Sequence, residues 1–161
     1  MICLHRSCIL AAALFAAVSA RTAPAQTHPK ARAASPCALL TVAQINAVAG
    51  TQVQPGQPGH SGTVDCTWND SKGQNRVYLA LEDATDFHSF RLQMQATGNL
   101  LPISGVGEDA FFVSSAAGSS AALYTLKDKH LLLLTVDGPG FTKGQNEAAE
   151  KALATSALTR L

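Results

Sequence analysis

Charged residues are scarce in this sequence, and neither sign is clustered. Asp, Glu, Lys and Arg make up 14% of the 161 residues. Beyond residue 25 there are ten Lys and Arg against eleven Asp and Glu, which leaves a net charge of about −1. Proteins that bind nucleic acid or an anionic membrane surface do so through clustered cationic side chains. Because the bases are scattered, we expect no nucleic-acid partner.

The sequence also lacks an apolar run long enough to cross a bilayer, which takes about 20 residues. Its most apolar segment, residues 9–18, is about half that length and follows the positive charge of Arg6. Small residues follow at Ala20 and Ala25. This order is typical of a secretory signal peptide. We predict a signal peptide over residues 1–25, with cleavage after Ala20 as the alternative, and export to the periplasm or the medium.

Cysteine is equally scarce, with four in the chain and only Cys37 and Cys66 beyond the predicted signal peptide. Cys3 and Cys8 precede the apolar run, so neither is placed to carry a lipid anchor. Two cysteines in an exported chain usually pair, because the compartment is oxidising. Such a bond would stabilise the fold by roughly 3–4 kcal/mol. Two free thiols are the alternative, and so is a metal site, although no Cys-x-x-Cys partner is present.

No motif typical of an active site occurs. Gly105 and Gly107 suggest a dinucleotide-binding loop, but the third glycine is replaced by Ala110 and a strand pattern follows instead of a helix. The histidines beyond the signal peptide lack metal-ligand spacing, and no Gly-x-Ser-x-Gly elbow exists. We therefore expect no cofactor and no metal. The acidic doublet Glu108 and Asp109, beside the glycines, is the best candidate for a binding site.

Hydrophobic periodicity predicts helices and strands in the order helix, hairpin, helix, three-strand meander, helix. The predicted helices cover residues 42–49, 86–96 and 143–160. The predicted strands cover residues 63–69, 76–82, 110–114, 121–127 and 130–136, with residues 100–103 as an added edge segment. Tight turns between strands require antiparallel pairing. The predicted fold class is therefore α+β: an antiparallel sheet of five to six strands packed with three helices, in one domain over residues 36–161. Residues 26–35 are expected to be a flexible leader.

A few residues determine the expected packing. Thr41 and Gln44 have capping-box spacing at the start of the first helix. Cys66 and Trp68 alternate with polar residues, so Cys66 should point into the core, where its disulfide would fasten the first helix to the sheet. Residues 131–134 are all leucine, which predicts a central strand covered on both faces.

A resemblance to a known family rests on three short segments and an Ala-rich final helix. The segments are residues 36–41 (Pro-Cys-Ala-Leu-Leu-Thr), 66–68 (Cys-Thr-Trp) and 105–110 (Gly-Val-Gly-Glu-Asp-Ala). Together they resemble a family of uncharacterised bacterial secreted proteins and lipoproteins, although the anchoring cysteine of the lipoproteins is missing here. The resemblance implies that the two cysteines pair. It also implies a fold similar to the photosystem oxygen-evolving accessory proteins, and by analogy a binding or assembly role.

These observations predict an exported, non-catalytic domain that binds a protein partner or a small ligand. One alternative is a small hydrolase that uses Glu108 or Asp109 with a histidine brought near by folding. Another is a structural protein of envelope assembly. A pocket that joins the two carboxylates to a histidine would favour the hydrolase. A broad exposed apolar surface would favour the binding domain.

Overall fold

The computed structural model describes residues 35–60, 64–114 and 120–161, which belong to one compact unit. The predicted signal peptide, and the predicted leader up to residue 34, lie outside the described residues. The helices are α1 (Pro36–Leu39), α2 (Val42–Ala49), the 3₁₀ turn η1 (Ala84–Asp86), α3 (Phe87–Ala96) and α4 (Lys143–Leu158). The strands are β1 (Gln57–Pro58), β2 (Asp65–Asn69), β3 (Arg76–Asp83), β4 (Leu100–Ile103), β5 (Asp109–Ser114), β6 (Ala121–Lys127) and β7 (His130–Asp137).

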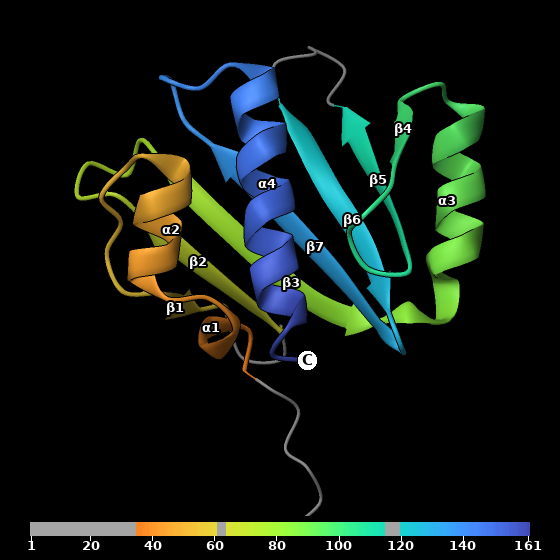
Figure 1. Ribbon diagram of the computed structural model, residues 1–161, viewed down its shortest axis with the longest axis horizontal. Coiled ribbons are helices and arrows are strands. Elements are labelled where there is room, and N and C mark those ends of the chain that lie inside the picture. The colour runs from red at the N-terminus through yellow and green to blue at the C-terminus, as the bar shows by residue number, and fades with distance from the viewer. Residues whose placement is uncertain (1–34, 61–63, 115–119) are drawn as a thin grey trace, which may run out of the picture. The chain divides into compact units, whose positions relative to one another are not determined.

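The strands form one antiparallel sheet in the order β1-β2-β3-β7-β6-β5-β4 (Figure 1). The predicted α+β class with an antiparallel sheet is confirmed. The described residues form seven strands and four α-helices, whereas the sequence predicts five to six strands and three helices. The additional elements are β1, with two residues, and α1, with four. Periodicity requires a window of about 11 residues, so it does not detect elements this short.

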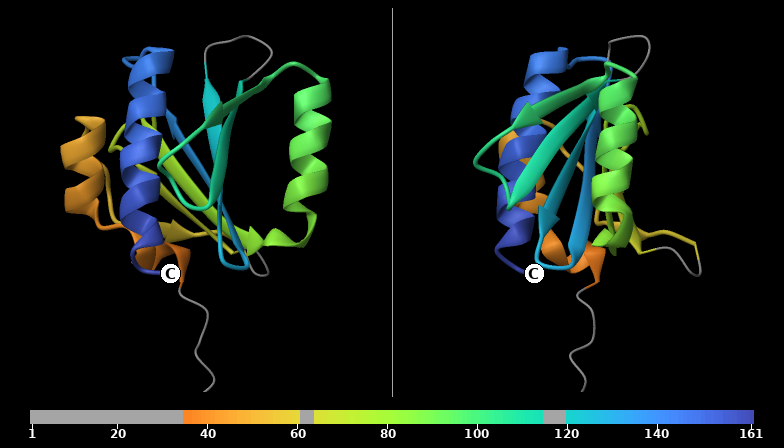
Figure 2. Two further views of the ribbon diagram at one scale, coloured as in Figure 1. Left: turned by 45° about the vertical axis from the view of Figure 1, so that its right-hand side comes forward. Right: turned by 90° about the vertical axis from the view of Figure 1, so that its right-hand side faces the viewer.

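The two faces of the sheet are covered unequally. We call the face under α1, α2 and α4 the closed face, and α3 lies on the opposite side of the sheet (Figure 2). The closed face carries the main core, whose buried members include Trp68, Leu79, Phe112, Leu123, Leu134 and Leu153. The side of α3 has a smaller buried cluster of Phe87, Phe111 and Leu131. Most of the apolar burial therefore lies on the closed face.

Hydrogen bonds at the helix starts match the sequence. The Thr41 hydroxyl accepts from the Gln44 N–H, and the Gln44 side chain accepts from the Thr41 N–H, which confirms the predicted capping box. Thr142 and Gln145 repeat this arrangement at the start of α4. Each box satisfies backbone donors that have no partner within the helix.

The edge strand β4 is protected by its proline. Because the Ser114 N–H donates to the Asn99 carbonyl, the alternation of an antiparallel ladder makes Pro102 face away from β5. The missing N–H of Pro102 therefore costs no bond inside the sheet, and the outer edge has one donor fewer for an incoming strand. The prediction of an edge position for residues 100–103 is confirmed.

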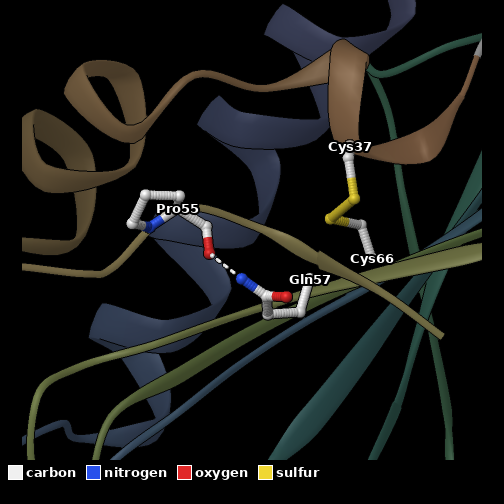
Figure 3. Close-up of a disulfide and its surroundings, with 4 residues drawn as sticks. All are labelled: Cys37, Pro55, Gln57 and Cys66. Atoms are coloured by element: carbon white, nitrogen blue, oxygen red, sulfur yellow. Dashed lines mark hydrogen bonds between the residues drawn. A yellow bond between two sulfur atoms is a disulfide. The ribbon is translucent and has the colours of Figure 1, made fainter.

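Cys37 of α1 and Cys66 of β2 form a disulfide, with their Cα atoms 5.1 Å apart (Figure 3). This is the pair that the sequence predicts. Cys66 is fully buried. The bond fastens the short helix α1, which the sequence does not predict, to the sheet, whereas the predicted first helix, α2, begins after it.

The loop before β1 covers this disulfide closely. Gln57 donates from Nε2 to the Pro55 carbonyl over 3.3 Å, which closes a short turn around Gly56 (Figure 3). A Cβ atom at Gly56 would lie 2.6 Å from both Cys66 Sγ and Trp68 Nε1. Only glycine fits between this loop and the two rigid groups under it.

Candidate functional site

The predicted acidic doublet follows a tight glycine turn. Gly105 and Gly107 both have positive φ, at 82° and 61°. A Cβ atom at Gly107 would also collide with the Leu126 carbonyl and the Thr125 hydroxyl. The glycines therefore allow the chain to turn sharply into β5, which explains this motif without a nucleotide.

Glu108 and Asp109 do not act as a pair. Glu108 Oε1 accepts the N–H of Asp128 at 2.8 Å, in the turn between β6 and β7. Asp109 forms an ion pair with Arg91 of α3, whose guanidinium lies 5.9 Å from the centre of the Phe111 ring. The two carboxylates thus serve separate structural contacts.

Glu108 also borders a shallow cavity of about 320 Å³ next to the end of α4. Lys127, Thr155, Leu158 and Thr159 line this cavity, and within the described residues its lining includes no histidine. Lys127 Nζ donates to the Leu158 carbonyl at 2.5 Å. The polar side chains here are therefore bonded to backbone groups, and nothing in the geometry favours acid–base chemistry.

A different region is open to a ligand: the part of the sheet that α3 leaves uncovered. Phe90 of α3 lies on Tyr124 of β6, with ring centres 4.8 Å apart. Along the same cross-strand row, Tyr124 is followed by Leu133, Ala80 and Asp65, on β7, β3 and β2. Directly paired residues share a face, and among the described elements none covers this row beyond Tyr124.

The leucine strand is predicted to be central and covered on both faces. Its central position is confirmed, but one of its leucines is not fully covered. β7 is central, and Leu131, Leu132 and Leu134 are buried. Leu133 is only half-buried, because Phe87 and Phe90 of α3 pack on the rings of β5 and β6 and leave a hollow beside Leu133. One side of the central strand thus retains an accessible apolar residue.

The uncovered region contains a hollow of about 420 Å³ above β2 and β3, which we call the acidic hollow. Ala80 lies at its floor, between Tyr78 and Glu82 on the same strand and opposite Asp65. The hollow exists because alanine is much smaller than the side chains on either side of it. Its outer side is formed by Val64, which is 49% exposed.

A second hollow of about 300 Å³ adjoins the first, and we call it the aromatic hollow. Its apolar lining consists of Phe87, Phe90, Tyr124, Leu131 and Leu133. Glu82 and Asp83 line both hollows, so the two lie side by side between α3 and β2. We call the two hollows together the open-face groove.

The carboxylates give the groove a negative electrostatic potential. The pKa of Tyr78 is raised by burial and by the carboxylates of Asp65 and Glu82, against the opposing charge of Arg76. The pKa of Tyr124 is raised by burial and then by Glu82 and Tyr78. The charge of Arg76, which opposes this effect at Tyr78, is shared with Asp137, to which Arg76 forms an ion pair at 3.0 Å.

Two groove carboxylates differ in their contacts. Asp83 accepts hydrogen bonds from the N–H and the hydroxyl of Thr85, and these bonds lower its pKa. Asp65 Oδ1 is buried and has no hydrogen-bond partner among the described residues. A buried acceptor without a donor is energetically unfavourable, so a ligand that brings a donor to Asp65 would gain a strong bond.

Another unusual carboxyl lies on the closed face, outside the open-face groove. Glu150 of α4 is fully buried, and its Oε1 accepts the Val136 N–H at 2.8 Å, where the pairing of β7 with β6 has ended. Burial raises the pKa of Glu150 to about 8, helped by Asp137 and Glu147 and opposed by the bond from Val136. Glu150 is therefore protonated at neutral pH and replaces a missing strand partner.

Two further searches concern metals and membranes. Across residues 35–60, 64–114 and 120–161, no three His, Cys, Asp or Glu side chains are grouped as metal ligands would be. In that same part of the chain, none of the helices has both the length and the apolar character needed to cross a membrane.

Comparison with known proteins finds no match: no protein family, no curated protein and no solved structure is similar to this chain. The resemblance proposed from the three short segments thus stays a prediction. The open-face groove is the feature that sequence reasoning missed. Its only sequence signal is Tyr78, Ala80 and Glu82 at alternate positions of one strand, a small residue between two large ones.

Proposed function

We propose that this protein is an exported, non-catalytic binding domain whose ligand or partner occupies the open-face groove. The observation that carries the proposal is the uncovered part of the sheet: a half-buried leucine and two tyrosines beside carboxylates, on strands whose other face is filled by core. Mixed aromatic and polar surface of this kind is typical of binding sites.

Export is supported by the signal-peptide pattern of residues 1–25 and by the disulfide between Cys37 and Cys66. Disulfides persist in oxidising compartments and are rare in the cytosol. The hydrolase alternative is less well supported, because Glu108 and Asp109 contact different groups and do not converge. No specific observation favours an envelope-assembly role over binding.

Site-specific photo-crosslinking would test the proposal. A benzophenone amino acid would replace Tyr78 in the groove or, as a control, Leu92, which is 67% exposed on α3 and lines neither hollow. Each protein would be irradiated in an extract of the exported fraction of producing cells, and adducts identified by mass. We expect a distinct adduct from position 78 only, and we expect Ala80→Leu, which fills the acidic hollow, to abolish it.

Three results would contradict the proposal. Identical adducts from both positions would indicate non-specific contact, and the absence of any adduct from position 78 would indicate that the groove is not a binding site. Persistence of the adduct in the Ala80→Leu variant would place binding elsewhere on the domain.

A further inference from the structure

We infer that the partner presents a basic, extended peptide segment to the open-face groove, with a Lys or Arg side chain in the acidic hollow and an apolar side chain in the aromatic hollow. This inference rests on the proposed function and specifies the chemistry of the occupant.

The acidic hollow has the groups that an organic cation requires. Asp65 and Glu82 line it from neighbouring strands, and the Tyr78 ring lies beside both. A guanidinium or ammonium donates charge-assisted hydrogen bonds to carboxylates and is attracted to aromatic faces. Asp65 Oδ1 is buried and lacks a donor among the described residues, so this carboxylate has an unused capacity to accept a hydrogen bond.

The small size of Ala80 gives the cation space. Ala80 is 4% exposed and lies directly opposite Asp65 on one side and Leu133 on the other. A larger residue at this position would fill the space between Tyr78 and Glu82, which are its neighbours on the same face of β3. The hollow therefore depends on one methyl group, which makes it simple to block by substitution.

The charges around the groove favour a cation over an anion. Glu82, Asp83 and Asp86 line the aromatic hollow, and Asp65 adds a fourth carboxylate in the acidic hollow. The cationic side chains nearby already have acidic neighbours. Arg76 forms an ion pair with Asp137, and the charges of Lys129 and His130, near the β6–β7 turn, interact with Asp83. An anionic ligand would thus meet repulsion along most of the groove.

The arrangement of the two hollows favours a peptide over a free amine. They meet at Glu82 and Asp83, and Ala80 and Leu133 below them are direct cross-strand neighbours, about 5 Å apart. In an extended segment, side chains two positions apart lie on the same side, roughly 7 Å from each other. A basic residue and an apolar residue at such positions would occupy the two hollows together.

NMR titration with short capped peptides would test this inference. The probe is acetyl-Arg-Ser-Leu-amide, and the matched control is acetyl-Glu-Ser-Leu-amide. With the ¹⁵N-labelled mature domain, we expect the Arg peptide to shift amide signals of β2, β3 and the start of α3, and the Glu peptide to shift none. Binding should weaken as salt is raised, because the contact is partly exposed.

Substitutions would locate the cation. Glu82→Gln together with Asp65→Asn should weaken binding of the Arg peptide at least tenfold, and Ala80→Leu should abolish it. Glu147→Gln, which removes a carboxylate on α4 at the closed face, should leave the affinity unchanged. Retention of the remaining amide signals in each variant would show that the domain is folded.

Three outcomes would overturn the inference. These are equal binding of the Glu peptide, shifts confined to other elements, and arginine amide alone binding as tightly as the peptide, which would indicate a small-molecule ligand. If the Arg peptide fails while the probe at Tyr78 still captures a partner, only the inference fails. If neither experiment shows binding, the proposed function fails as well.

Discussion

The two faces of β3 and β7 differ although they belong to the same strands. On the closed face, Val77, Leu79 and Leu134 are almost completely buried under helices. On the other face, Tyr78 and Leu133 remain half-buried and surround a hollow. The comparison indicates that the closed face provides most of the stability of the fold, whereas the opposite face has side chains that remain accessible for contact. Substitutions on the two faces should therefore affect different measurements.

The sharpest test uses two adjacent leucines of β7. Leu134 is completely buried, so Leu134→Ala should leave a cavity and lower the free energy of unfolding by about 3–4 kcal/mol. Leu133, half-buried on the open side, should lose about 1 kcal/mol or less on the same change. Urea denaturation of both variants measures the difference. Equal losses would show that the open side is as tightly packed as the closed face, and the comparison would fail.

Removal of the disulfide measures how much this bond contributes to the stability of the closed face. Cys37→Ala and Cys66→Ala should each lower stability by about 3 kcal/mol, because each removes the same link from the unfolded chain. The double variant should melt at the same temperature as the single variants. Thermal unfolding measures this, and clearly additive losses would indicate that the two cysteines act separately.

The buried carboxyl of Glu150 gives the closed face a pH dependence. Its folded pKa of about 8 lies above the ordinary value of 4.5, so the folded state keeps a proton that the unfolded state releases. Stability should therefore be greatest below pH 4.5 with respect to this group, and should fall between pH 4.5 and 8 by something on the order of 4 kcal/mol, because each unit of pKa difference corresponds to about 1.4 kcal/mol.

Glu150→Gln is the matched variant for this effect. The amide still offers an oxygen to the Val136 N–H but cannot ionise. The native protein should therefore lose stability relative to the variant as the pH rises. Chemical denaturation at pH 5, 7 and 8.5 would measure it. A difference independent of pH would show that Glu150 is ionised in the fold.

Much of the closed face could be predicted from the sequence. Periodicity gives the bounds of α2 and β6, the Thr41 box marks the first helix start, and alternation directs Cys66 inward. These features depend on neighbours along the chain. The short elements α1 and β1 carry too few residues for such a signal.

The open-face groove could not be predicted in the same way. Alternation shows which residues share a face, but not which part of that face a helix covers. Coverage depends on where α3 packs, and its position is determined by Phe87 and Phe90 against Phe111 and Tyr124, which are distant in sequence. The sequence also could not show what Glu108 and Asp109 contact, because Asp128 and Arg91, their partners in the structure, lie about 20 residues away along the chain.

The order of the strands also determines how the chain reaches this fold. Five of the six strand pairings join neighbours along the sequence, and only the seam between β3 and β7, with Leu79 opposite Leu134, brings distant segments together. Local hairpins form quickly, whereas non-local pairing must first overcome the entropy of closing a long loop. We therefore expect one closure event to limit the folding rate, so that loosening this seam slows folding more than loosening any hairpin.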